Sequence, residues 1–159
     1  LVLLRTFSKG FCAAGVRCGV LFAQESIVQA LMNLQTPWQL TPFTIEATKV
    51  ILEYTENNPW FQEQVNAVVK ERERLFKMLN RLNSRVYTIF PSQANFLLIK
   101  SKDKETHQAL LTACATLGVL IKDLSNESRL ENYVRVTVGT ADANNQFYQA
   151  LKDANKEQS

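Results

Sequence analysis

Hydrophobic residues recur at two different spacings along this chain. Spacings of three and four residues are typical of helices with one buried face, and they predict helices at 25–35, 42–54, 59–82, 104–117 and from 141 onward. Continuous apolar runs and strict alternation are typical of strands, and they predict strands at 1–6, 16–23, 86–90, 95–100, 119–122 and 133–139. The chain is therefore expected to have an α/β fold.

The order of these elements predicts two domains. Residues 1–58 are expected to be the end of an α/β layer, whose first strand is apolar throughout and therefore predicted to be buried on both faces of a parallel sheet. Residues 59–159 begin with a long connecting helix and continue as a small α+β domain. Because the chain opens with leucine inside an apolar run, we expect it to be the C-terminal part of a longer protein.

Composition excludes several classes of protein. The net charge of +3 is too small to indicate a nucleic-acid-binding protein, and no apolar run approaches the roughly 20 residues of a membrane span. The three cysteines form no C-x-x-C pair and their number is odd, so a disulfide framework is not expected. These features favour a protein of the reducing cytoplasm that binds neither nucleic acid nor membrane.

The stretch "TFSKGFCAAGVRCG" carries the first candidate chemistry, with Thr6, Ser8, Lys9 and Arg17 among small and apolar residues. Two hydroxyls and a guanidinium suit a phosphate, and a neutral lysine amine can form a Schiff base with an aldehyde. Pyridoxal 5′-phosphate carries both groups. We expect the glycines of this stretch to permit tight turns and close backbone approach. From these residues alone, an ordinary surface loop remains the alternative.

A second candidate is Arg135, which lies in the alternating stretch "YVRVTVG". It shares one face of the predicted strand with Thr137, whereas the valines occupy the other face. Arg135 is therefore either solvated or available to an anionic ligand. His107 is the only histidine and has no second ligand at a metal-binding spacing, so we expect it on a helix surface and predict no metal site.

Three stretches, "LRTFSKGFCAAGVRCGVLFA", "PSQANFLLI" and "YVRVTVGT", resemble fold-type I pyridoxal-phosphate aminotransferases. They are most similar to the histidinol-phosphate aminotransferases, whose pattern is T-x-S-K-x-F…G-x-R-x-G. The resemblance implies that Lys9 bears the cofactor and that Thr6, Ser8 and Arg17 hold its phosphate. It also implies that Arg135 binds the anionic end of a substrate. Lys122 stands where many relatives have arginine, and can meet a phosphate only as a point charge.

The resemblance further implies a cytoplasmic homodimer that exchanges an amino group between histidinol phosphate and 2-oxoglutarate in histidine biosynthesis. The acidic residue and the stacking ring that serve the cofactor in this family precede the lysine strand, so the chain alone is expected to be inactive. An aromatic aminotransferase, a threonine-phosphate decarboxylase of the same fold and a non-catalytic α+β module remain open as alternatives.

Overall fold

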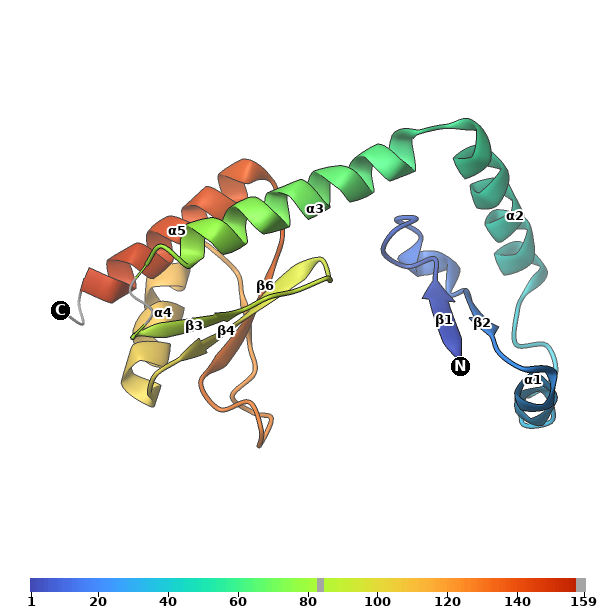
Figure 1. Cartoon of the computed structure of the whole chain (residues 1–159), viewed down its shortest axis with the longest axis horizontal. Helices are drawn as coiled ribbons and strands as arrows, with labels where there is room; N and C mark the ends of the chain where they lie inside the picture. The colour runs from blue at the N-terminus through green and yellow to red at the C-terminus, as the bar shows by residue number, and fades with distance from the viewer. Residues whose placement is uncertain (83–84, 157–159) are drawn as a thin grey trace. The chain divides into compact units, whose positions relative to one another are not determined.

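A computed structural model describes residues 1–82 and 85–156 and divides them into two units, one spanning Leu1–Val65 and the other beginning at Asn66. The elements of the first unit are β1 (Leu3–Thr6), a 3₁₀ turn (Ala14–Val16), β2 (Gly19–Phe22), α1 (Glu25–Met32) and α2 (Pro42–Asn57). Helix α3 (Trp60–Leu79) contains the boundary. The elements of the second unit are β3 (Tyr87–Phe90), β4 (Phe96–Ser101), α4 (Lys104–Thr116), β5 (Lys122–Asp123), β6 (Tyr133–Thr137) and α5 (Ala141–Lys156), as Figure 1 shows.

Strands β1 and β2 form an antiparallel pair that brings Thr6 opposite Gly19. A Cβ atom at position 19 would lie only 2.9 Å from the carbonyl oxygen of Arg5, closer than such atoms approach in real proteins. Glycine is therefore required where the two strands come together, as the sequence predicted for this position.

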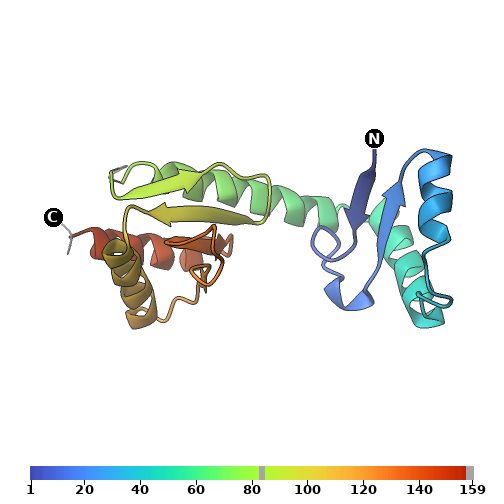
Figure 2. The ribbon, with the colours of Figure 1, turned by 90° about the horizontal axis from the view of Figure 1, so that it is seen from below.

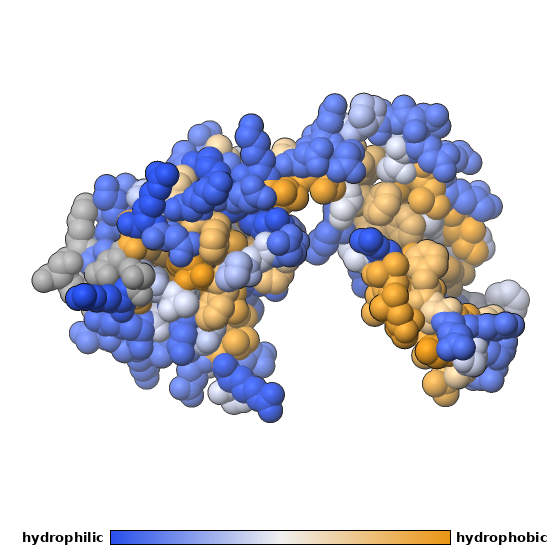
Figure 3. Space-filling model, in the orientation of Figure 1, coloured by the Kyte–Doolittle hydropathy of each residue, from blue (hydrophilic) through white to orange (hydrophobic). Residues whose placement is uncertain are grey.

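The prediction that β1 is buried on both faces is wrong for the described residues. Leu3 and Leu4 are exposed, Leu4 to 69%, because β2 is the only strand that pairs with β1 and no described layer covers it. Exposed large apolar side chains gather in the first unit, as Figure 3 shows, whereas among the described residues of the second unit only Leu117 and Leu120 are of this kind. The first unit thus presents faces that lack a partner.

Helix ends follow the capping signals in the sequence. The hydroxyl of Thr41 accepts a hydrogen bond from the Thr44 amide at 3.1 Å, and a proline occupies the first position of α2. The side chain of Asp103 accepts one from the Thr106 amide at 2.8 Å at the start of α4. Gly118 ends that helix with φ of +69°, the left-handed conformation that glycine adopts without strain.

The second unit is a four-stranded antiparallel sheet in the order β3-β4-β6-β5. The C-terminal part of α3, together with α4 and α5, covers one face of this sheet, as Figures 1 and 2 show. The largest fully buried apolar side chains of this core are Phe147, Leu75, Leu79, Leu97, Ile99, Leu110 and Leu151. The sheet therefore has one buried face and one face that points away from the helices.

A polar network anchors α3 to the start of α5. Arg74 donates hydrogen bonds to both carboxylate oxygens of Glu71, at 2.8 and 2.6 Å, and the Nδ2 atom of Asn144 donates to Glu71 Oε1 at 2.8 Å. The buried Asn144 side chain also bonds the amide and the carbonyl of Gly139, at 3.0 and 3.1 Å. The hydrogen bond from Arg74 is the main cause that holds the pKa of Glu71 below its ordinary value, against the opposing effect of burial.

We expect Glu71→Gln to lower the free energy of unfolding by about 1 kcal/mol at pH 7, a modest value because Arg74 is 37% exposed and solvent screens the pair. A carboxylate with a lowered native pKa stabilises the fold above its unfolded-state pKa of about 4.3, and this contribution is lost as the pH falls through the native value. The difference between variant and wild type should therefore shrink toward pH 3 in urea titrations. Glu73→Gln, on an exposed position of the same helix, is the control, and an equal loss there would contradict the assignment.

Candidate functional site

The residues between β1 and β2, 7–18, form a closed turn that we call the lysine loop. The Phe7 amide donates a hydrogen bond to the Cys18 carbonyl at 3.2 Å, and the Ala13 amide donates to the Phe7 carbonyl at 3.1 Å. A third bond, from the Cys12 amide to the Lys9 carbonyl at 3.0 Å, tightens the turn at the lysine. These bonds bring the chain at Arg17 back beside the end of β1, although Arg17 is eight positions after Lys9 in the sequence.

Two hydroxyls lie together where β1 enters the lysine loop. The Thr6 hydroxyl donates to Ser8 Oγ at 3.0 Å and accepts a hydrogen bond from the Ser8 amide at 3.1 Å. The Lys9 side chain follows at an exposed position, and it forms no hydrogen bond or ion pair with any residue that the structure describes. Lys9 therefore presents an amine without a described partner next to two hydroxyls that are hydrogen-bonded to each other.

Arg17 is held in an unusual backbone conformation at the other side of this loop. Its φ is +56°, in the left-handed region that costs a non-glycine residue of order 1 kcal/mol or more. One guanidinium nitrogen, Nη1, donates to the Ala14 carbonyl at 2.9 Å, which leaves the other donors for a ligand. Cys12 has φ of +52°, whereas Gly10 and Gly15 lie outside the left-handed region. Gly10 lies within the turn from Lys9 to Cys12, but neither of these two glycines uses the left-handed conformation.

Aromatic rings of the lysine loop pack against one another and against α3. Phe7 is buried, and its ring centroid lies 4.8 Å from that of Phe11, which in turn lies 6.1 Å from Phe61. A cavity of about 660 Å³ adjoins these rings and is bounded by Arg5, Gly10 and residues 55–65. None of the predicted site residues Thr6, Ser8, Lys9 and Arg17 lines this cavity.

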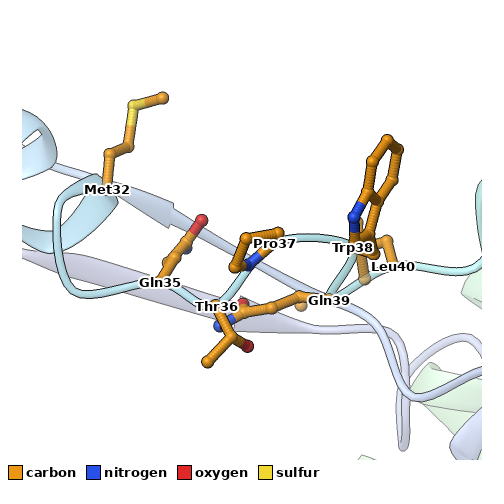
Figure 4. A pocket seen from close by; sticks show the side chains of 8 residues that line it. Met32, Gln35, Thr36, Pro37, Trp38, Gln39 and Leu40 are labelled. Atoms are coloured by element: carbon orange, nitrogen blue, oxygen red, sulfur yellow. The ribbon is translucent and has the colours of Figure 1, made fainter.

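A second cavity in this unit, of about 520 Å³, follows the segment from Met32 to Leu40 (Figure 4). Met32 and Trp38 point to the same side of this segment, and Trp38 is 94% exposed with φ of +66°. None of the predicted cofactor or substrate residues lines this cavity. Its lining mixes polar and apolar side chains and lies outside the lysine loop.

Arg135 and Lys122 form a second group, on the sheet of the other unit. They are directly opposite each other on neighbouring strands β6 and β5, and both are exposed. The valines at 134, 136 and 138 point into the core, as the alternation predicted, so Arg135 lies on the face away from the helices. The structure therefore brings the predicted residues together as two groups, four in the first unit and two in the second.

The sequence interpretation of His107 as a surface residue is wrong. His107 is 4% exposed, and its Nε2 atom lies 3.0 Å from Asp123 Oδ1 and 2.9 Å from Ser125 Oγ. Because a carboxylate only accepts, Nε2 carries the proton. Its spacing to Leu110 and Cys114 on the buried face of α4 is the signal that could have located it.

The same cluster fixes the short strand β5, which carries Lys122. Burial alone would raise the pKa of Asp123, but hydrogen bonds from the Ser125 hydroxyl and amide and from His107 hold that pKa below its ordinary value. Asp123 therefore stays ionised and ties β5 to α4. The described residues contain no group of three or more His, Cys, Asp or Glu placed to hold a metal ion. The described helices include none with the length and apolar character of a membrane span.

The cysteines have contrasting surroundings. Cys12 is exposed and Cys18 is partly exposed, both in the lysine loop. Cys114 lies in the core of the second unit, where burial raises the pKa of its thiol to about 11. The three described thiols are free, as the sequence predicted.

Comparison with known proteins places this arrangement in a family. The sequence model of the family "Aminotransferase class I and II" matches residues 1–151. Histidinol-phosphate aminotransferase of Thermococcus kodakarensis is 37% identical over 153 residues, which cover 96% of this chain and 40% of that protein.

Solved structures show the same fold. Histidinol-phosphate aminotransferase from Clostridium acetobutylicum matches with a TM-score of 0.79 at 24% identity, covering 99% of this chain and 46% of that one. L-threonine-O-3-phosphate decarboxylase from Porphyromonas gingivalis matches with a TM-score of 0.74 at 27% identity, covering 98% and 47%. The chain thus spans about two fifths of the length of the curated relatives that it matches. Because the family's sequence model covers nearly all of its residues, the chain belongs to the class I and II aminotransferases.

Proposed function

We propose that this chain provides the cofactor-holding lysine and the substrate-binding arginine of a pyridoxal-phosphate-dependent aminotransferase. The observation that carries the proposal is the lysine loop, in which the Thr6 and Ser8 hydroxyls contact each other at 3.0 Å and Arg17 is brought to the same end of β1. Two hydroxyls and a guanidinium with unused donors fit a phosphate dianion, and a free amine beside them fits an aldehyde.

In this proposal each residue has a distinct part. Thr6, Ser8 and Arg17 hold the phosphate of pyridoxal 5′-phosphate, which supplies an aldehyde and an electron-accepting ring when bound. The Nζ atom of Lys9 would hold the cofactor through its aldehyde group and, as a free amine, would move the proton at the substrate Cα. Arg135, with Lys122 opposite it, binds the anionic end of the substrate.

The substrate pair that fits best is histidinol phosphate with 2-oxoglutarate, because the most similar curated relatives are named for histidinol phosphate. Residues 1–58 then form the end of the cofactor-binding domain, and residues 59–159 the connecting helix and the small domain. The proposal also includes a cytoplasmic homodimer. The segment 32–40, with the exposed Trp38, is a candidate for its interface.

A phosphoamino-acid decarboxylase is the second candidate. The structural match to L-threonine-O-3-phosphate decarboxylase favours it, because that protein has the same fold at 27% identity. Both candidates act on a phosphorylated amine, so the cationic pair Arg135 and Lys122 suits either. They differ in which bond at the substrate Cα is broken.

The test is an assay of the full-length protein with pyridoxal phosphate present. We expect glutamate to form from 2-oxoglutarate with histidinol phosphate as donor, at a kcat/KM at least roughly tenfold above that with phenylalanine, since a site built for a phosphate dianion rejects a substrate that lacks this group. Release of CO₂ from threonine phosphate without glutamate formation would support the decarboxylase instead. If borohydride reduction attaches no cofactor to Lys9, the proposal that the chain is part of a pyridoxal-phosphate enzyme is wrong. The alternative of a non-catalytic α+β module is then favoured.

A further inference from the structure

The face of the second unit's sheet that points away from the helices has an unusual composition. Strand register and alternation place on it three cations and three aromatic rings, namely Lys100, Lys122, Arg135, Phe90, Phe96 and Tyr133. The remaining described strand positions on this face are threonine or leucine, so the strands contribute no carboxylate to it. Its cations therefore have no acidic partner on the sheet.

Arg135 rests on one of these rings. Its guanidinium carbon lies 5.4 Å from the centroid of the Phe96 ring, close enough for a cation–π contact. The side chain of Arg135 forms no hydrogen bond or ion pair with any described residue. The ring thus lies beside the guanidinium, and the N–H donors of the guanidinium have no partner among the described residues.

Lys122 adds a second positive charge beside this edge. Its Cα atom is paired with that of Arg135 across β5 and β6, and like charges directly opposite each other destabilise a sheet. An anion that lies between the two side chains removes this repulsion. The pair therefore favours a ligand group with negative charge, and it favours a dianion most.

Phe96 itself is held by a braced turn, residues 91–95. Arg72 is 7% exposed, and it donates hydrogen bonds to the Ala94 carbonyl at 3.2 Å and to Gln93 Oε1 at 3.4 Å. At the end of the turn the Val138 amide donates to the Asn95 carbonyl at 2.9 Å, which fixes the start of β4 against the end of β6. The backbone just before Phe96 is therefore held by hydrogen bonds from Arg72 and from the Val138 amide.

We propose that Phe96 is a positioning residue that holds Arg135 with its N–H edge toward the anionic end of the substrate. This inference rests on the proposed function, because it assumes that Arg135 binds a substrate anion. An arginine side chain loses rotamer freedom when it binds, and a ring that already fixes its plane reduces that loss. The shared ligand chemistry is a phosphate or carboxylate oxygen that accepts two N–H bonds.

The test is steady-state kinetics of Phe96→Leu in the full-length protein. We expect KM for the substrate whose anion meets Arg135 to rise about two- to fivefold, the factor that an exposed cation–π contact supports, while kcat stays within about twofold. Phe96→Tyr keeps a ring and should keep KM. Phe90→Leu removes a ring from the same face, one stacked on Tyr133 and not on Arg135, and should leave KM unchanged. The unfolding midpoint of each variant shows that it is folded.

A double variant separates positioning from a general structural effect. In an Arg135→Lys background, Phe96→Leu should add nothing to KM, because the plane that the ring orients is gone. If KM rises for histidinol phosphate alone, the anion that meets Arg135 is the phosphate of that substrate. If KM rises for 2-oxoglutarate as well, both substrates bind their anionic end at Arg135. Either result supports the inference.

Two results overturn it in distinguishable ways. If Arg135→Lys raises KM but Phe96→Leu does not, or if Phe96→Leu raises KM equally in the Arg135→Lys background, the positioning role fails and the proposed function stands. If Arg135→Lys leaves both KM values unchanged, the substrate-binding part of the proposed function fails together with the inference.

Discussion

Lys9→Ala is expected to lower kcat of the full-length protein by about 10²- to 10⁴-fold, the range in which a positioned acid–base group contributes to catalysis. The physical reason is that the Lys9 amine has two uses in the proposed reaction, to hold the aldehyde and to take the proton from the substrate Cα. The measurement is glutamate formation with histidinol phosphate, together with borohydride reduction and peptide mapping. The variant should carry no reduced cofactor at position 9.

The matched control is Lys49→Ala on α2. Lys49 is an exposed lysine of the same unit, and its ammonium lies 2.7 Å from Glu46 Oε1 in a surface ion pair of small energetic value. Its replacement should leave kcat unchanged. If Lys9→Ala kept more than about a tenth of the wild-type kcat, Lys9 could not be the proton-transferring group.

Phe147→Ala is expected to lower the free energy of unfolding of the second unit by about 3–5 kcal/mol. Phe147 is the largest fully buried side chain, and it packs from α5 into the core between the helices and the sheet. Its removal loses the transfer free energy of the ring and leaves a cavity, because α4 and α5 can only partly close around it. Hydrogen exchange of β4 and β6 amides measures this loss in the unit concerned.

Two features of the chain sharpen that experiment. Both tryptophans, Trp38 and Trp60, belong to the first unit, so tryptophan fluorescence reports separately on that unit and should change little in the variant. Lys152→Ala, on the exposed side of α5, should change stability by no more than about 0.5 kcal/mol. A loss below about 1 kcal/mol for Phe147→Ala would show that the helices close over the missing ring.

The second unit was largely predictable from its sequence because local and global signals agree there. Strict alternation at 134–138 correctly predicted the strand and its buried face, and Gly118 correctly predicted the end of α4. The strand at 119–122 was less well predicted, since β5 contains only Lys122 and Asp123. Its position depends on hydrogen bonds from residues 107 and 125, which no local pattern of hydrophobicity reveals.

The first unit was less predictable because its apolar runs have few described partners. The apolar run 1–4 predicts a buried strand. Whether that strand is buried depends on neighbouring strands and helices, which the run itself does not encode. The grouping of Thr6, Ser8, Lys9 and Arg17 stays a prediction from spacing and resemblance, to which the structure adds the hydrogen bond between the Thr6 and Ser8 hydroxyls. The left-handed conformation of Arg17 was not predictable, because it is set by the hydrogen bonds that close the loop around it.

The uneven protection of the thiols makes this chain suitable for site-selective chemistry. At neutral pH the Cys114 sulfur is enclosed and stays protonated, so alkylating reagents react slowly with it while the fold is intact. A thiol-reactive dye can reach the sulfurs of Cys12 and Cys18, which lie three residues after Lys9 and directly after Arg17. A fluorophore attached at Cys12 or Cys18 would lie within the lysine loop without any engineered cysteine, and its emission is expected to change when the coenzyme binds.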